Sequence, residues 1–120
     1  MCGIYGILTL SGTRRYAPDA LTRMGDAIVH RGPDDSGALE DGELLLGMRR
    51  LSIIDVTGGH QPIASEDGHI VAVCNGEIYN FRELRRELEA AGHRFATHSD
   101  SEVVVHAYEQ FGEEFLRRLD

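Results

Sequence analysis

The chain opens with Met1-Cys2-Gly3-Ile4-Tyr5-Gly6, and the cysteine at its second position is the most informative residue of the sequence. We expect Met1 to be removed, because initiator methionine is usually cleaved when a small residue follows it. Cys2 would then carry both a thiol and a free α-amine. Such an amine is partly unprotonated at neutral pH, so it can accept the thiol's proton and later return one to a leaving group. The alternative is that Cys2 is an ordinary small residue, so other residues of the chain must decide.

The composition is that of a globular domain. The 120 residues suffice for one domain with one core, and 42% of them are hydrophobic, with dispersed charges. No apolar run approaches the ~20 residues that cross a bilayer, and no secretory signal is visible, so we expect a cytoplasmic protein without a membrane partner. The net charge of −8 and the lack of a basic face predict that nucleic acid is not a partner.

Several mechanisms are excluded by residue usage. All 12 basic residues are arginine, so neither a Schiff-base lysine nor a phosphate-loop lysine exists in this chain. The distant pair Cys2 and Cys74 predicts no disulfide and fits no zinc motif. The six histidines are scattered, without His-x-His or His-Glu-x-x-His. We therefore expect no metal site and no cofactor in this chain.

The first half of the chain predicts strands around one helix. Residues 3–10 are short, apolar and partly β-branched, which is typical of a strand. The apolar side chains of residues 18–30 recur at helical spacing. Residues 36–40 and 43–50 form a predicted hairpin with its turn at Asp41-Gly42, and residues 51–56 are predicted to be extended.

The second half predicts a hairpin followed by helices. Strand, turn and strand are expected across residues 62–74. Asn80 with Glu83 has the spacing of a capping box, which predicts a helix from residue 81 to 91 that ends at Gly92. A short strand over residues 93–97 and a second capping box, Ser99 with Glu102, precede a helix to about residue 111 and a last one over 113–119. This order of elements predicts an α+β fold with antiparallel strands.

A terminal nucleophile needs oxyanion donors and groups that hold a substrate. The pair Asn75-Gly76 follows a run of apolar residues, where a side-chain amide and a backbone N–H can converge on one oxygen. Arg50, at a strand end, could hold a carboxylate by two parallel hydrogen bonds. Asp100 and Glu77 could accept from a substrate ammonium group. Each of these residues also has a purely structural interpretation, as part of a turn, as a surface charge or as a helix cap.

Five ordered blocks together give a specific resemblance. The chain resembles the class II glutamine amidotransferases, and most closely the N-terminal part of glutamine-hydrolysing asparagine synthetases. The match covers the whole chain, and the block at Arg50 has the form found in asparagine synthetases and in relatives with other acceptors. The five blocks are Met1-Cys2-Gly3-Ile4, His30-Arg31-Gly32-Pro33-Asp34, Arg50-Leu51-Ser52-Ile53-Ile54-Asp55, Asn75-Gly76-Glu77-Ile78-Tyr79-Asn80 and Ser99-Asp100-Ser101-Glu102.

The resemblance implies a role for each site residue. Cys2 would attack the side-chain amide of glutamine to form a glutamyl thioester, and glutamate and ammonia would be released. Asn75 and Gly76 would hold the oxyanion. The glutamine-binding residues would be Arg50 for the α-carboxylate, Glu77 and Asp100 for the α-amino group, and Leu51, Ser52, Ile53 and Ile54 for the pocket wall.

The resemblance also implies an αββα sandwich of the N-terminal-nucleophile hydrolase type, of which residues 1–120 would be the N-terminal part. We expect a truncated glutaminase domain that is inactive and folds poorly by itself, because incomplete sheets leave unpaired edges. The implied parent adds a synthetase domain using ATP and Mg²⁺ to make asparagine from aspartate, and can form a homodimer. Two alternatives stay open, namely an amidotransferase with a peptide or cell-surface sugar acceptor and a non-catalytic glutaminase-like module.

Overall fold

The computed structural model describes residues 2–10, 12–13, 16–52 and 58–120. The chain forms two compact units, each described here by itself. The first consists of Met1–Ser52, His60–Pro62 and Val73–Asn75, and the second of Ile53–Gly59, Ile63–Ala72 and Gly76–Asp120. The described residues combine helices with antiparallel strands, which confirms the predicted α+β class.

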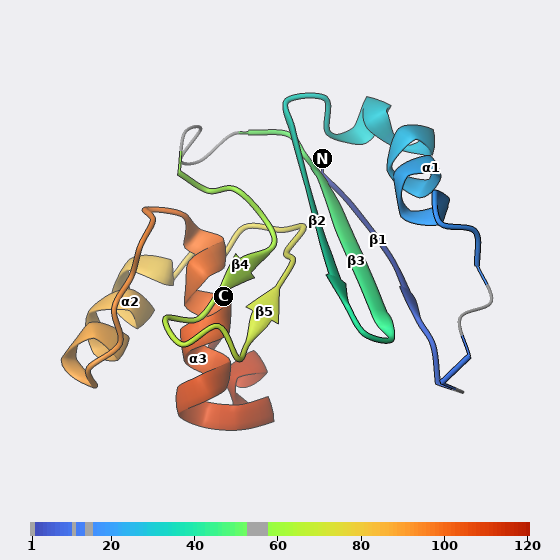
Figure 1. The fold of residues 1–120 in the computed structure, drawn as a ribbon. Coiled ribbons are helices and arrows are strands. Elements are labelled where there is room, and N and C mark those ends of the chain that lie inside the picture. The colour runs from blue at the N-terminus through green and yellow to red at the C-terminus, as the bar shows by residue number, and fades with distance from the viewer. Residues whose placement is uncertain (1, 11, 14–15, 53–57) are drawn as a thin grey trace. The chain divides into compact units, whose positions relative to one another are not determined.

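The first unit is built on an antiparallel sheet in the order β1-β3-β2 (Figure 1). Strands β1 (Gly3–Leu8), β2 (Asp35–Asp41) and β3 (Leu44–Arg50) follow the predicted ranges closely. The hairpin of β2 and β3 turns at residues 42–43, as the Asp41-Gly42 signal predicts. The register pairs Gly3 of β1 with Arg49 of β3, which brings the start of the chain to the carboxyl end of β3.

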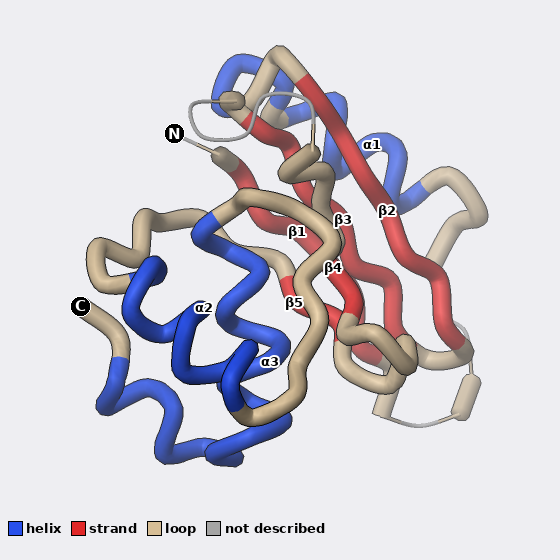
Figure 2. The backbone as a smooth tube through the Cα atoms, turned by 90° about the vertical axis from the view of Figure 1, so that its left-hand side faces the viewer, coloured by secondary structure: helices blue, strands red, loops and turns tan. Residues whose placement is uncertain are grey.

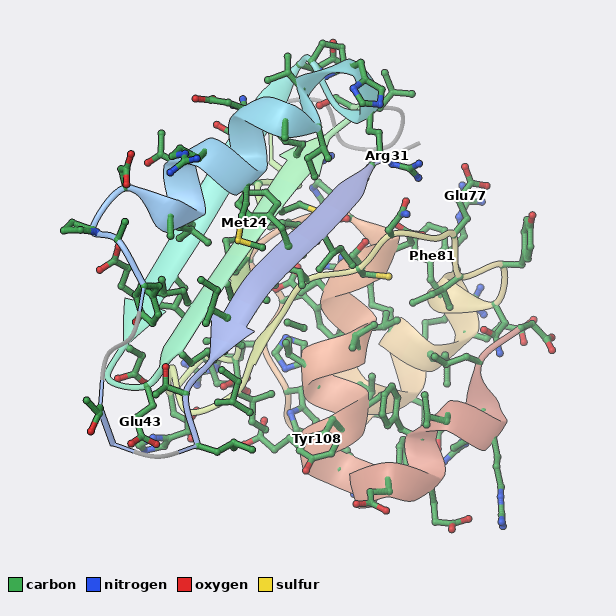
Figure 3. All side chains as sticks on the ribbon, turned by 90° about the vertical axis from the view of Figure 1, so that its right-hand side faces the viewer. Met24, Arg31, Glu43, Glu77, Phe81 and Tyr108 are labelled. Atoms are coloured by element: carbon green, nitrogen blue, oxygen red, sulfur yellow. The ribbon has the colours of Figure 1, made fainter. Side chains whose placement is uncertain are left out.

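One face of this sheet is covered by helix α1 (Ala20–Ala27). Leu21 of α1 is buried, and Met24 points from the helix toward the sheet (Figure 3). The helix is shorter than the predicted residues 18–30, because the chain tightens into a 3₁₀ helix, η1 (Val29–Arg31). This tightening places Arg31 beside the start of β1.

The second unit packs helices beside a small hairpin (Figure 2). Its strands β4 (Ile63–Ala64) and β5 (Val71–Ala72) are much shorter than the predicted span of 62–74. The turn between them is long because the Ser65 hydroxyl donates to Asp67 at 2.8 Å and accepts from the Ile70 N–H at 3.1 Å. Side-chain hydrogen bonds of this kind compete with ladder bonds of a strand.

Three helical segments complete the second unit after α2 (Phe81–Ala90): η2 (Asp100–Glu102), α3 (Val103–Phe111) and η3 (Gly112–Arg118). Leu84 and Leu88 lie one turn apart on α2 and pack against Val103 and Ala107 of α3. Ile78 joins this core, and Phe95 packs against its edge. The predicted last helix is therefore present, as a 3₁₀ helix shifted by one residue.

The predicted strand over residues 93–97 is wrong. The N–H groups of Ala96 and Thr97 donate to the two carboxylate oxygens of Glu102, at 2.7 and 2.8 Å, and the Thr97 hydroxyl adds a third bond at 2.6 Å. Glu102 is 2% exposed, so these bonds satisfy a buried charge. A backbone held by a carboxylate in this way has no N–H groups left for a neighbouring strand at these positions.

The capping box predicted at Asn80 and Glu83 is also wrong. Of the one predicted at Ser99 and Glu102, only the Ser99 cap is correct. The Asn80 side chain makes no cap and instead donates to the Arg118 carbonyl and accepts from the Asp120 N–H. Ser99 does cap its helix by accepting from the Ser101 N–H, while Glu102 reaches back beyond it to residues 96 and 97. Contacts outside the capping-box spacing thus replace the expected ones at both places, with distant residues at Asn80 and with the preceding loop at Glu102.

None of the described helices combines the length and the apolar character needed to cross a bilayer.

The core between α2 and α3 makes a stability prediction. Leu88 is 0% exposed, so Leu88→Ala removes a buried side chain and leaves a cavity, which should lower the free energy of unfolding by about 2–5 kcal/mol. The control is Leu116→Ala, because Leu116 is 64% exposed and its truncation should change stability by less than about 0.5 kcal/mol. Equal shifts of the two variants in denaturant unfolding of the purified protein would contradict this core.

Candidate active site

The thiol of Cys2 is held by the main chain just beyond β3. Its Sγ lies 3.4 Å from the Leu51 N–H, which donates to it, and 3.7 Å from the Leu51 carbonyl, to which it donates. The backbone carbonyl of Cys2 accepts from Arg31 Nε at 3.1 Å, and Arg31 points at the start of β1 (Figure 3). The thiol and the backbone carbonyl of Cys2 are therefore both held by residues that are far away in sequence.

The block at residues 30–34 packs against the end of β3. A Cβ on Gly32 would overlap the backbone of Arg49 and Arg50, so only glycine fits there. Pro33 forms a bridge with Arg50, and the Asp34 N–H donates to the Arg50 carbonyl at 3.1 Å. The Asp34 carboxylate then accepts from the Ser52 N–H at 2.9 Å. This loop therefore fixes the path of residues 50–52, which in turn hold Cys2.

Arg50 is 5% exposed at the last position of β3. A guanidinium buried to this degree is stable only with hydrogen-bonding partners. Its neighbour Leu51 carries the two backbone groups that contact Cys2 Sγ. The predicted nucleophile and the predicted carboxylate-binding residue therefore lie at the same end of one sheet.

The segment that ends at Asn75 is anchored by Gln61, which is 4% exposed. Gln61 Oε1 accepts from the Cys74 N–H at 2.7 Å, and Gln61 Nε2 donates to the Cys74 carbonyl at 3.2 Å. The backbone of Gln61 lies so close to Gly37 of β2 that a Cβ there would overlap the Gln61 carbonyl. A chain of contacts from β2 through Gln61 thus positions Asn75, whose own side chain is exposed.

The remaining predicted site residues belong to the second unit. Asp100 is 4% exposed, and its Oδ2 accepts from the Ile78 N–H at 2.9 Å while Oδ1 accepts from the Ser101 N–H at 2.9 Å. The hydrogen bond from the Ile78 N–H to Asp100 holds residues 76–78 against the start of η2. Gly76 and Glu77 are exposed, and no heavy atom lies within 4 Å of a Cβ built on Gly76. Asp100 therefore both closes its own turn and fixes the backbone beside Glu77.

The structure thus gathers the predicted site residues into two groups. Cys2, Arg50, Leu51, Ser52 and Asn75 belong to the first unit, and Gly76, Glu77 and Asp100 to the second. The predicted pocket residues Ile53 and Ile54 lie outside the described residues.

Two residues that position the site have no role in the sequence-based prediction. Arg31 is only one member of the block at residues 30–34, and Gln61 belongs to none of the five blocks. Neither has a sequence signal by itself, because each acts through main-chain atoms of residues 13 or more positions away.

A depression of about 270 Å³ lies elsewhere in the first unit, between α1 and β2. Tyr5, Thr22, Asp26, Glu40 and Arg49 are among the side chains that line it. None of the predicted catalytic or glutamine-binding residues contributes to its wall, so we assign it no part in the chemistry.

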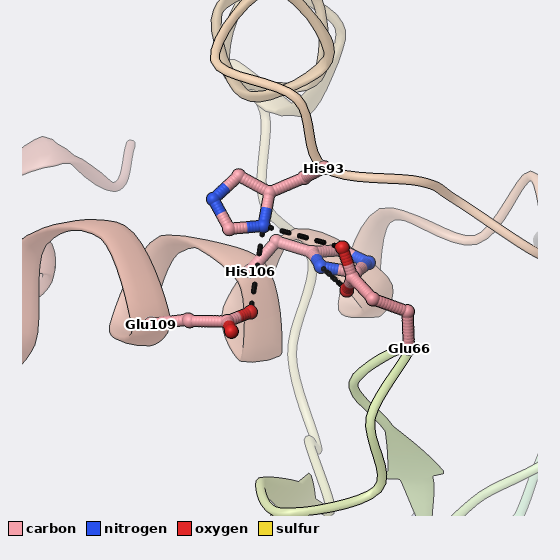
Figure 4. Close-up of side chains that lie close together, drawn as sticks. All are labelled: Glu66, His93, His106 and Glu109. Carbon is pink, nitrogen blue, oxygen red and sulfur yellow. Dashed lines mark ion pairs between the residues drawn. The ribbon is translucent and has the colours of Figure 1, made fainter.

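A cluster of possible metal ligands occupies the second unit (Figure 4). Glu66, His93, His106 and Glu109 each offer one ligand atom, and these atoms lie within 4.8 Å of one another. The backbone N–H of Glu66 lowers the pKa of its own carboxyl below the ordinary value; desolvation opposes this, and the Arg94 N–H and the two histidines lower it further. Glu66 is therefore ionised at neutral pH.

Comparison with known proteins identifies the family. The model of the glutamine amidotransferase domain family matches residues 1–120. The glutamine-hydrolysing asparagine synthetase of Asparagus officinalis is 43% identical over 100% of this chain and 20% of its own length. Two such synthetases of Bacillus subtilis (strain 168) are 44% and 46% identical over 99% and 97% of this chain, and over 19% and 16% of their own lengths.

This chain therefore spans about a fifth or less of the relatives it matches. The match to the family model extends over the full sequence, and the relatives carry glutamine hydrolysis in their printed names. Both findings confirm the resemblance and the enzyme class predicted from the five sequence blocks. The chain belongs to the glutamine amidotransferase domain family.

Proposed function

We propose that this domain hydrolyses glutamine to glutamate and ammonia through a thioester on Cys2. The observation that carries the proposal is the contact of the Cys2 thiol with the Leu51 N–H at 3.4 Å, because Leu51 directly follows buried Arg50 at the end of β3. A sulfur held in a fixed position, at the sheet end that also carries an arginine able to pair with a carboxylate, suits a nucleophile for an amino-acid substrate.

The first half of the reaction forms the thioester. With Met1 removed, the α-amine of Cys2 takes the thiol proton, and Sγ attacks the side-chain amide carbon of glutamine. The negative charge that develops on the amide oxygen is stabilised by the Asn75 side-chain amide and the Gly76 N–H. The carbon–nitrogen bond then breaks, and the amine returns its proton to the leaving nitrogen, which departs as ammonia.

The second half releases glutamate. The α-amine removes a proton from water, which attacks the thioester carbonyl, and the carbon–sulfur bond breaks to restore the thiol. Arg50 holds the α-carboxylate throughout, and its burial strengthens a bidentate pairing. The carboxylates of Glu77 and Asp100 bind the α-ammonium group; Asp100 keeps acceptor capacity beyond its bonds to the Ile78 and Ser101 N–H groups. Leu51, Ser52, Ile53 and Ile54 form the pocket wall.

We further propose that the ammonia serves an ATP-dependent synthesis of asparagine from aspartate in a longer cytoplasmic polypeptide. The support is that the relatives carry asparagine synthetase in their names and that this chain covers only 16–20% of the three compared above. ATP and Mg²⁺ would bind a C-terminal synthetase domain, since residues 1–120 contain no lysine for a phosphate loop. The sheets of both units would belong to an αββα sandwich of the N-terminal-nucleophile hydrolase type.

Removing the nucleophile should separate the two activities of the full-length protein. Cys2→Ala should reduce release of glutamate from glutamine to the assay background, because no thioester can form. Ammonium salt supplied directly should still support asparagine formation in that variant. Glutamate release at the wild-type rate by Cys2→Ala would exclude Cys2 as the nucleophile.

Removing the oxyanion donor should affect turnover strongly. Asn75→Ala should lower the glutaminase rate by roughly 10²–10³-fold, because one donor to the developing charge is lost. Asn80→Ala is the matched control, since the Asn80 side chain bonds to the backbone of Arg118 and Asp120. A glutaminase rate for Asn75→Ala equal to that of Asn80→Ala would reject the assignment.

The support of Asn75 by Gln61 makes a separate kinetic prediction. Gln61→Leu leaves the Cys74 N–H and carbonyl without the side chain that now satisfies them, so the segment before Asn75 should shift. We expect kcat to fall by roughly ten- to a hundredfold with a much smaller change in KM, because the misplaced donor acts mainly in the transition state. Gln110→Leu, at an exposed glutamine of α3, is the control. Loss of stability with unchanged kcat in Gln61→Leu would limit Gln61 to a structural role.

A further inference from the structure

We propose that Glu66, His93, His106 and Glu109 form a site for one divalent transition-metal ion, for which Zn²⁺ is the probe. These residues come from three separate segments: the turn after β4, the loop after α2, and α3 (Figure 4). This proposal is independent of the glutaminase reaction, because none of the four residues belongs to the proposed catalytic or glutamine-binding set.

The spacing of the facing atoms suits a small ion. His93 Nδ1 lies 3.6 Å from Glu66 Oε1 and 3.4 Å from Glu109 Oε2, and His106 Nδ1 lies 2.9 Å from Glu66 Oε2. Tetrahedral zinc with bonds of 2.0–2.2 Å to nitrogen and oxygen places its ligand atoms roughly 3.3–3.6 Å apart, so the two His93 distances match and the His106–Glu66 distance must widen slightly. All four ligand atoms lie within 4.8 Å of one another, and the exposed Glu109 side chain can rotate toward the others.

The buried ring of His106 supports the metal site independently of the distances between the ligand atoms. Its ring is 0% exposed, and among the described residues neither ring nitrogen has a hydrogen-bond partner of acceptable geometry. Nδ1 is within contact distance of Glu66 Oε2 but is not aligned with it as a hydrogen bond requires. A buried ring nitrogen left in this state is unfavourable, and coordination of a metal ion at Nδ1 would satisfy it.

The surroundings of His93 direct its lone pair into the cluster. His93 Nε2 lies 3.1 Å from Gln110 Oε1, an acceptor, so a neutral ring carries its proton on Nε2 and leaves Nδ1 facing Glu66 and Glu109. Nε2 of His106 lies 3.6 Å from the carboxyl group of buried Glu102, which is too far for a hydrogen bond. An outer carboxylate or carbonyl that fixes the second nitrogen is the usual companion of a metal-binding histidine.

The type of ligand narrows the choice of ion and its role. The cluster offers two imidazole nitrogens and two carboxyl oxygens. Nitrogen and oxygen ligands in this combination suit Zn²⁺ and neighbouring transition ions better than Ca²⁺ or Mg²⁺, which prefer oxygen alone. Four protein ligands leave no open position, so the ion would tie the three segments together rather than activate a substrate.

The test is metal binding by the full-length protein after treatment with a chelator. Calorimetric titration with Zn²⁺ should show one ion per chain, and Co²⁺ should give the visible absorption of a four-coordinate site. Glu109→Gln, at an exposed residue, should weaken Zn²⁺ binding at least tenfold and abolish the Co²⁺ spectrum, and His93→Ala should do the same. Glu113→Gln and His60→Ala, both at exposed residues outside the cluster, should bind as the wild type does.

Zinc can also bind thiolates, so Cys2→Ala is titrated in parallel. Stoichiometric binding that survives in Cys2→Ala and is lost in Glu109→Gln supports the site. The proposal is overturned if no saturable binding occurs, or if binding persists in Glu109→Gln and His93→Ala and disappears in Cys2→Ala. The decisive variant is Glu109→Gln, because Glu109 is exposed and buried His106 is left unchanged, so loss of binding there does not arise from a disrupted core.

Discussion

The contact between the Cys2 thiol and the backbone of Leu51 is the constraint on which the rest of the first unit depends. One sulfur accepts from the Leu51 N–H and donates to the Leu51 carbonyl, at 3.4 and 3.7 Å. This is possible only because β1 and β3 are paired with Gly3 opposite Arg49, which brings residue 2 to the point where β3 ends. The loop at residues 32–34 then holds the same point from the other side, through Gly32 and Pro33. A short sequence at the start of the chain is thereby given the fixed geometry that a nucleophile needs.

Glycines and buried polar side chains, more than apolar packing, set this geometry. Gly32 lets its loop touch the backbone of β3, and Gly37 of β2 lets the Gln61 carbonyl touch β2, more closely than any side chain would permit. The Gln61 amide then makes two bonds to Cys74, much as a neighbouring strand would. In the second unit, Glu102 and Asp100 act in the same way on the N–H groups of Ala96 and Ile78. Buried polar groups with several partners specify one backbone path, which a purely apolar core does less well.

The sequence predicts those features whose cause is local. The hairpin of β2 and β3 follows from its turn residues, and helix α2 keeps to the predicted range of 81–91 within one residue, although the capping box that indicated it does not form. The failures come from side chains that bond to main-chain groups outside the local pattern. The strand expected over residues 93–97 is absent because Glu102 binds its N–H groups, and Asn80 does not cap its helix because its side chain bonds to the distant residues 118 and 120. The cluster of Glu66, His93, His106 and Glu109 matches no metal-binding sequence motif, because its members come from three separate segments and have no characteristic spacing.

The most direct test of the central claim is the chemistry of the N-terminus. The full-length protein is treated with an electrophile that mimics glutamine, and the labelled peptide is analysed by mass spectrometry. The account predicts a mature chain that begins at Cys2 and carries the label on the Cys2 sulfur, with Cys74, the other partly exposed cysteine, unlabelled. Retention of Met1 in an enzyme that still releases ammonia from glutamine at full rate, or a label on Cys74 in place of Cys2, would contradict it.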